Sequence, residues 1–220
     1  MYRLRDNLYH CRSGGRSIFL DVDANKYFCL SDPMEQAFAG YIEGSSGTAH
    51  HELDTLVARG VLVPDKMSER IAAGVPPPIP ISEIGAWASL DPSAFQVARA
   101  IGYQISAALS LRYTSLAAVK FKIAERSARV RRCSRQLPNA EIAKISAAFE
   151  RTSLVLASAD RCLVRSLALM SMMHAYGIAP RLIFGVRTNP FSAHSWVQLR
   201  DVVLNDTAEH ARLFVPILVI

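Results

Sequence analysis

Two short apolar runs rich in β-forming residues stand near the start of the chain. They cover residues 17–21 and 26–30, and a four-residue segment, 22–25, separates them. Two such runs at this spacing are typical of a β-hairpin with a four-residue loop. The pattern therefore predicts an antiparallel hairpin close to the N-terminus.

Helical spacing replaces the alternation after this hairpin. Asp32 and Pro33 provide an N-cap and a first-turn proline for a helix that reaches about Ile42. A second helix is expected over 48–59, where leucine and valine recur three and four residues apart, and a short strand follows at 61–63. Hairpin, two helices and strand together predict a small winged-helix-like unit.

A proline-rich stretch, VPPPIP at 75–80, interrupts the pattern. It cannot join a helix and favours a stiff, extended linker. We therefore expect an N-terminal domain over 1–74, a linker over 75–91 and a second domain over 92–220.

The second domain begins with helical patterns and ends with strands, which predicts the α+β class. The predicted helices cover 93–111, 115–135, 139–157 and 160–176, and the last of them is capped by Asp160 and closed by Gly177. The predicted strands cover 181–187, 195–199 and 202–204.

The formal charge of +6 comes from the second domain, and most of it lies within 120–135. Seven Lys and Arg side chains in that segment face only one acidic residue, Glu125. A solvated face of an amphipathic helix explains this charge, although a basic run also attracts acidic partners. We expect no nucleic-acid binding, because no zinc-finger spacing or aromatic RNA-binding motif accompanies the charges.

The four cysteines are far apart and include no CxxC pair; they are Cys11, Cys29, Cys133 and Cys162. The N-terminus lacks the apolar core of a signal peptide, and the chain has no uncharged apolar stretch of about 18 residues. These features predict a cytoplasmic protein with reduced thiols, no membrane span and no metal site.

Cys162 falls in the first turn of the last predicted helix. Unpaired N–H groups and the helix dipole favour a negative charge there and lower the pKa of a thiol. The alternative is an inert, buried cysteine, the usual state of an isolated one.

His194 and Asp206 flank predicted strands in the last part of the chain. His194 precedes the strand SWVQL at a loop exit, where an imidazole can act as a base, although a loop histidine is also a common surface residue. Asp206 follows a strand, so that neighbouring antiparallel strands could bring the two side chains together. Asn205-Asp206 is equally typical of a strand-end turn.

Four motifs in this order resemble one protein family. They are CLVRSLAL at 162–169, GVR at 185–187, PFSAHSWV at 190–197 and VLND at 203–206. The segment is similar to the lasso peptide B-type maturation proteases of the transglutaminase-like superfamily. The resemblance implies a papain-like cysteine peptidase domain with Cys162, His194 and Asp206 as its catalytic triad.

In the implied mechanism Cys162 attacks the scissile carbonyl, and His194 protonates the leaving amine. Asp206 holds His194 in the required tautomer. An oxyanion hole is also needed, and the N–H of Cys162 is the natural first donor. The second donor cannot be assigned from the sequence.

The N-terminal unit resembles the PqqD-type leader-recognition fold, through SIFLDVDANKYFCLS, a following helix and LVARGVLV. In that family a leader peptide adds as a strand to the hairpin edge and packs against the last helix. The residues implied to bind the leader are Lys26, Tyr27, Phe28, Cys29, Leu30, Leu53 and Val57. Some of these side chains could instead simply belong to the core.

The resemblance implies a precursor peptide as substrate and an asparagine synthetase-like lasso cyclase as partner. No cofactor is expected on this chain, and because no GxxxxGK[ST] loop is found, any ATP dependence would reside in that synthetase. Two alternatives stay open: acyl transfer to an amine instead of water, and an inactive module that only escorts a peptide.

Overall fold

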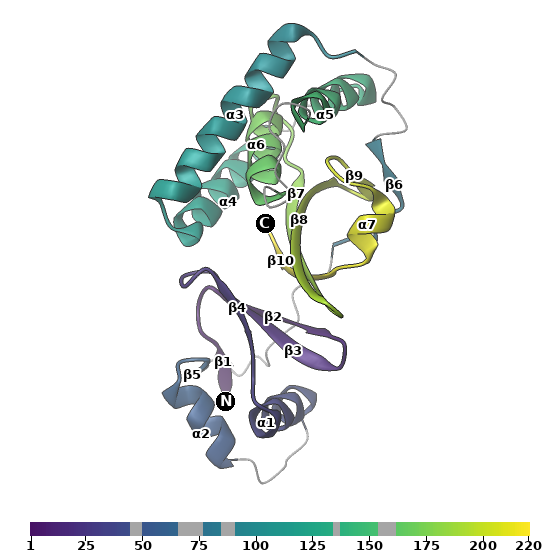
Figure 1. Cartoon of the computed structure of the whole chain (residues 1–220). Coiled ribbons are helices and arrows are strands. Elements are labelled where there is room, and N and C mark those ends of the chain that lie inside the picture. The colour runs from purple at the N-terminus through teal and green to yellow at the C-terminus, as the bar shows by residue number, and fades with distance from the viewer. Residues whose placement is uncertain (45–49, 66–76, 85–90, 134–136, 154–161) are drawn as a thin grey trace.

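The computed structural model describes residues 1–44, 50–65, 77–84, 91–133, 137–153 and 162–220. Its architecture is α+β, as predicted, with an N-terminal sheet and two helices followed by four long helices and a second sheet (Figure 1). None of the helices in these ranges is both long and apolar enough to cross a membrane.

The predicted hairpin is confirmed and forms part of a three-stranded antiparallel sheet. Its strands, in spatial order, are β2 (Leu8–Ser13), β3 (Arg16–Asp21) and β4 (Lys26–Cys29). Because successive residues of a strand point to opposite faces, Ile18 and Leu20 face one side and Phe19 the other. All three are buried, so both faces of the sheet are covered. β2 was not predicted, since His10 and Arg12 break its apolar pattern.

α1 (Asp32–Glu43) begins where the sequence predicts, although its N-cap is Ser31 and not Asp32. Asp32 instead belongs to the first turn, where a carboxylate favours the positive end of the helix dipole. Gly44 ends the helix at φ 76°, a conformation that glycine adopts without strain.

α2 (His50–Ala58) ends before Gly60, as expected. The first helix was predicted to stop, and the second to begin, within residues 45–49, which lie outside the described residues. The strand expected after α2 is β5 (Leu62–Pro64). It pairs with a strand that was not predicted, β1 (Tyr2–Leu4), instead of joining the hairpin sheet.

Four long helices follow, close to the predicted ranges. They are α3 (Ala94–Tyr113), α4 (Leu116–Arg132), α5 (Asn139–Ser153) and α6 (Cys162–Ala175). Ser93 caps α3 through a capping box with Gln96, and Ser115 caps α4. Asp160, the predicted cap of α6, lies outside the described residues.

The second sheet has five strands in the order β10–β7–β8–β9–β6. Their bounds are β6 (Ser82–Glu83), β7 (Arg181–Thr188), β8 (Phe191–Leu199), β9 (Val202–Val203) and β10 (Val215–Val219). The long helices cover one face, and a short helix that was not predicted, α7 (Ala208–Arg212), covers the other (Figure 1). β6 and β10 were also missed.

β8 begins earlier than the sequence predicts. The prediction placed His194 in a loop before the strand, but His194 lies within β8 and is in register with Gly185 of β7. The small and polar residues at 192–195 carry little β-signal of their own. Pairing with the strongly apolar β7 nevertheless extends the strand across them, and this fixes the backbone that carries the histidine.

One hydrophobic cluster joins the N-terminal sheet to the following helices and the second sheet. Ile18, Leu20 and Val22 belong to the same cluster as Met170 of α6 and Leu218 of β10. This shared core fixes β4 relative to the second sheet.

Polar and close backbone contacts cross the same boundary. The Lys120 ammonium donates to Asn7 Oδ1 and to the Tyr9 hydroxyl, the latter at 2.8 Å. Gly14 lies so close to Thr188 that a Cβ at this position would stand 2.3 Å from its hydroxyl oxygen.

Candidate active site

Cys162 is the first residue of α6, and it is half-buried. Burial alone would raise the pKa of its thiol, but hydrogen bonds from His194 and Ser195 and the charge of His194 lower that pKa below its ordinary value. The Ser195 hydroxyl is buried and makes no hydrogen bond of ordinary geometry to the described residues, so it is available to the thiolate. The surroundings therefore favour a thiolate.

His194 comes from β8 and connects the thiol to a carboxylate. Its Nε2–H donates to Asp206 Oδ2 at 2.6 Å, which leaves Nδ1 as the ring nitrogen available to Cys162. Burial lowers the pKa of His194, but the hydrogen bonds and negative charges of Asp206 and Cys162 raise it to about 9. At neutral pH the His194 imidazole is therefore protonated, and its positive charge favours the thiolate form of Cys162.

Asp206 lies in the turn between β9 and α7. Its Oδ1 accepts the Thr207 N–H at 2.8 Å, and its Oδ2 accepts from both His194 and His210. Burial would raise the pKa of Asp206, but these hydrogen bonds keep it below its usual value. The carboxylate thus stays charged beside the imidazolium.

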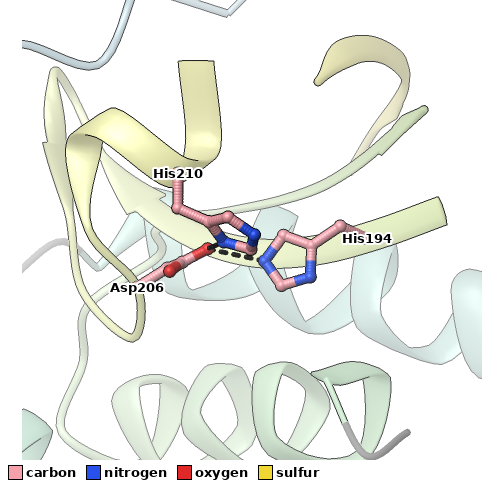
Figure 2. Close-up of side chains that lie close together, drawn as sticks. All are labelled: His194, Asp206 and His210. Carbon is pink, nitrogen blue, oxygen red and sulfur yellow. Dashed lines mark hydrogen bonds and ion pairs between the residues drawn. The ribbon is translucent and has the colours of Figure 1, made fainter. Parts of the chain in front are cut away.

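Sequence reasoning missed His210, whose Nδ1–H donates to Asp206 at 2.8 Å (Figure 2). A signal was present, because Thr207 is a good N-cap and a helix starting there places His210 one turn after Asp206. Asn205 and Ser195 were likewise given no separate role.

Aromatic rings enclose the His194 imidazole. Trp196 is stacked on it at a centroid distance of 6.0 Å, and Phe214 lies at 5.1 Å. Gly185 makes room for both, since a Cβ at this position would stand 2.8 Å from atoms of Trp196 and Phe214. The enclosure limits solvent around the ring, and it explains the need for glycine in the GVR motif.

A partly buried set of hydrogen bonds holds the loop of Asp206 against β8 and α6. The Asn205 side chain accepts the Val197 N–H at 2.8 Å and donates to Ser166 Oγ at 2.9 Å. Ser166 Oγ–H in turn donates to the Ser195 carbonyl at 2.9 Å. Helix, strand and loop are thereby tied together directly beside the three predicted triad residues.

His194, Asp206 and His210 offer ligand atoms within 4.8 Å of one another, a grouping that could surround a metal ion. The N–O distances of 2.6 and 2.8 Å are those of direct hydrogen bonds, which use these atoms already. The raised pKa of His194 also keeps it protonated at neutral pH, which disfavours its use as a ligand. The arrangement is suited to proton transfer.

The predicted leader-binding residues divide between a strand and a helix. β4 is an edge strand of its sheet, and no described strand pairs with its outer side. Lys26 and Cys29 are exposed on it. The apolar members of the predicted set that pack in the N-terminal core with α1 and α2 are Phe28, Leu30, Leu53 and Val57.

Tyr27 faces the opposite side of β4 and lies close to the predicted triad. Its ring contacts the Phe191 ring of β8 edge to face at 5.8 Å. Burial and the negative charges of Cys162 and Cys11 raise the pKa of Tyr27 to about 12. The free strand edge thus runs beside the candidate active site.

Comparisons with known proteins assign the second part of the chain to one family. A family model described as the transglutaminase-like superfamily matches residues 105–219, which include Cys162, His194 and Asp206. The chain is also similar to the microcin J25-processing protein McjB of Escherichia coli, with 44% identity over 45 residues, 20% of this chain and 22% of that protein. The match thus spans about a fifth of the length of that curated relative. No solved structure matches.

Proposed function

Because the chain belongs to the transglutaminase-like superfamily, we propose that it is a cysteine peptidase that removes the leader from a lasso peptide precursor. The observation that supports peptidase activity is the arrangement of Cys162, His194 and Asp206. A thiol of lowered pKa lies on one side of His194, and a charged carboxylate accepts its hydrogen bond on the other. This is the arrangement of an activated nucleophile, its base and the group that orients the base.

In the proposed reaction the Cys162 thiolate attacks the scissile carbonyl carbon, and the carbonyl oxygen becomes an oxyanion. The N–H of Cys162, at the start of α6, supports this charge. His194 then gives the proton on Nδ1 to the leaving amine, and an acyl-enzyme remains.

Water completes the reaction. His194, now neutral, removes a proton from water as the water oxygen attacks the acyl carbon, and Cys162 leaves as the thiolate. Asp206 keeps Nε2 of His194 protonated throughout, so that Nδ1 is the nitrogen that gains and loses the proton.

Two observations support a leader peptide as the substrate. McjB is named for the processing of microcin J25, and the similarity includes 45 residues of this chain. β4 also has no described strand on its outer side, where an extended peptide can add as a further strand, and Tyr27 of β4 contacts Phe191 of β8, three residues before His194. A peptide added at this edge would continue toward Cys162.

The proposal includes delivery of the core peptide to an asparagine synthetase-like cyclase. Cleavage frees the amine of the first core residue, and a macrolactam-forming enzyme needs that amine as its nucleophile. The N-terminal PqqD-type recognition unit, the binding roles of 26–30, Leu53 and Val57, and a cytoplasmic location belong to the same proposal. Any ATP would be used by the cyclase.

The test is mass spectrometry of a leader-containing precursor encoded beside this protein's gene. We expect the wild-type protein to release an intact leader and a core with a free amine, with or without the neighbouring synthetase and ATP. Cys162→Ala should abolish cleavage, and Cys133→Ala, which removes an exposed cysteine of α4's C-cap, should retain it.

Three outcomes would contradict parts of the proposal. An active Cys162→Ala protein would remove the triad assignment. A leader joined to an added amine, in place of a free leader carboxylate, would identify an acyltransferase. A wild-type protein that binds the precursor without cleaving it under any condition would identify an escort module.

A further inference from the structure

Asp206 Oδ2 accepts hydrogen bonds from two imidazoles, although the predicted triad needs only one. Figure 2 shows the His194 and His210 rings next to each other, both with a nitrogen directed at the carboxylate. The distances are 2.6 Å to His194 Nε2 and 2.8 Å to His210 Nδ1. His210 comes from a different element, α7, and is nearly half exposed, with 45% of its side chain accessible.

Two hydrogen bonds to backbone N–H groups fix the first turn of α7. Thr207 caps the helix by accepting the His210 N–H at 3.1 Å, and Glu83 of β6 accepts the Ala208 N–H at 2.8 Å. The His210 imidazole also packs edge to face against Phe214, at 5.2 Å between centroids. These contacts hold the Nδ1–H of His210 toward the carboxylate before any substrate binds.

We infer that His210 is a positioning residue: it fixes the orientation of the Asp206 carboxylate and so keeps His194 aligned with Cys162. Oδ1 is held by the Thr207 N–H and Oδ2 by the two imidazoles, so rotation of the carboxylate away from His194 would break all three hydrogen bonds. This role rests on the proposed functions of Cys162 and His194.

A purely structural role fits the observations less well. A histidine that is 45% exposed in a five-residue helix contributes little to the core, and its side-chain hydrogen bond goes to the predicted catalytic carboxylate. The other charged groups near the cluster are Arg187, over the Phe214 ring at 5.4 Å, and Glu83 at the start of α7. Neither donates to Asp206 among the described contacts.

The experiment measures how fast iodoacetamide alkylates Cys162 between pH 5 and 10, residue by residue, by peptide mass spectrometry. The exposed thiols of Cys29 and Cys133 serve as internal references in every sample. The rate reports the thiolate fraction, which depends on the alignment of His194. Wild type is compared with His210→Ala, His210→Asn and His210→Gln. Glu209→Ala, an exposed position of the same helix, controls for disturbance of α7.

In His210→Ala we expect the apparent pKa of Cys162 to rise and its alkylation near pH 6 to slow by about 10-fold, because one charge-assisted hydrogen bond is lost. His210→Asn should recover most of the rate, since its amide N–H occupies the place of Nδ1. His210→Gln should recover less, because its amide lies where Nε2 was. Glu209→Ala should match wild type, and the reference thiols should not change.

An alkylation profile of His210→Ala equal to that of wild type would refute the inference. The inference would also be refuted if Cys162 were alkylated equally slowly in the Ala, Asn and Gln variants while circular dichroism showed all three folded. That result would indicate a structural role for His210. Failure of the proposed function is distinguished by the precursor assay: a wild type that leaves the precursor uncut, while Cys162 still depends on His210, refutes the substrate and not the positioning role.

Discussion

His194 and His174 are both largely buried, yet their surroundings move their pKa values in opposite directions. His194 belongs to β8 and its ring contacts His210 of α7; 17% of its side chain is exposed, and its pKa is raised to about 9. His174 lies in α6, 9% exposed, and its pKa is lowered to about 4. Burial disfavours the charged form in both cases, so the neighbours decide the difference.

The neighbours of the two rings are of opposite charge. His194 donates to the Asp206 carboxylate and faces the Cys162 thiol. His174 exchanges a hydrogen bond with the Ser127 hydroxyl at 3.0 Å, while Arg126 and Arg131 of the basic helix α4 add to the effect of burial. A buried histidine is thus a charged acid in one region and a neutral packing group in the other.

Removing the carboxylate should make the His194 region resemble the His174 region. We expect Asp206→Ala to lower kcat/KM for precursor cleavage by about 10²- to 10³-fold and to lower the pKa of His194. Asp206→Asn should be less severe, since its amide oxygen can still accept the Nε2–H although the charge is lost. Cleavage kinetics and an NMR titration of His194 provide the two readouts. A variant with wild-type kinetics and a His194 pKa near 9 would show that another group supplies the effect.

The second prediction concerns the aromatic enclosure of His194. Gly185→Ala places a Cβ 2.8 Å from atoms of Trp196 and Phe214, so one of these rings must move. We expect kcat to fall by about 10-fold or more, with the melting temperature lowered as well. Gly102→Ala in α3, where a Cβ meets nothing within 4 Å, is the matched control and should keep wild-type activity. Normal cleavage by folded Gly185→Ala would contradict a role for the enclosure.

The third prediction is the pH dependence of cleavage. The reactive form needs Cys162 deprotonated and His194 protonated, and the pKa of the first is lowered while that of the second is raised to about 9. The rate should therefore rise as pH increases through the lowered thiol pKa, reach a maximum and fall as pH increases through about 9. Measurement of kcat/KM on precursor between pH 5 and 10 tests this. A rate that climbs steadily to pH 10 would describe an ordinary thiol nucleophile.

The sequence identified His194 as a candidate active-site residue but did not predict most of the groups that surround it. Cys162, His194 and Asp206 are polar groups within recognisable motifs, and the structure brings the three together. β8 was predicted too short because its extension depends on pairing with β7, a non-local contact. α7, and with it His210, is too short for helical periodicity to identify, although Thr207 marks its beginning.

His174 received no prediction at all, and the reason is physical. A single histidine inside the apolar run of α6 has the same local pattern whether it is charged or neutral. Its pKa is determined by burial and by Arg126 and Arg131, which are more than forty residues away in the sequence. The same holds for the contact between Tyr27 and Phe191, which depends on how β4 packs against β8.

The last prediction tests the His174 region and should have the smallest effect on activity. Because its folded pKa lies below its unfolded value, the unfolded chain binds more protons between about pH 6.5 and 4, and the free energy of unfolding falls as pH decreases through that range. The loss attributable to His174 is at most about 3 kcal/mol. His174→Gln keeps an amide where Nε2 meets Ser127 and cannot take up the proton, so it should lose less stability than wild type between pH 7.5 and 4.5. Urea unfolding at both pH values gives the stability loss of each protein. Burial also lowers the pKa of His10, but His10 is present in both proteins, so its contribution cancels when the two losses are compared. Cleavage at pH 7.5 should be unchanged. If both proteins lost the same free energy of unfolding between pH 7.5 and 4.5, His174 would not be a buried neutral histidine, and its contrast with His194 would be wrong.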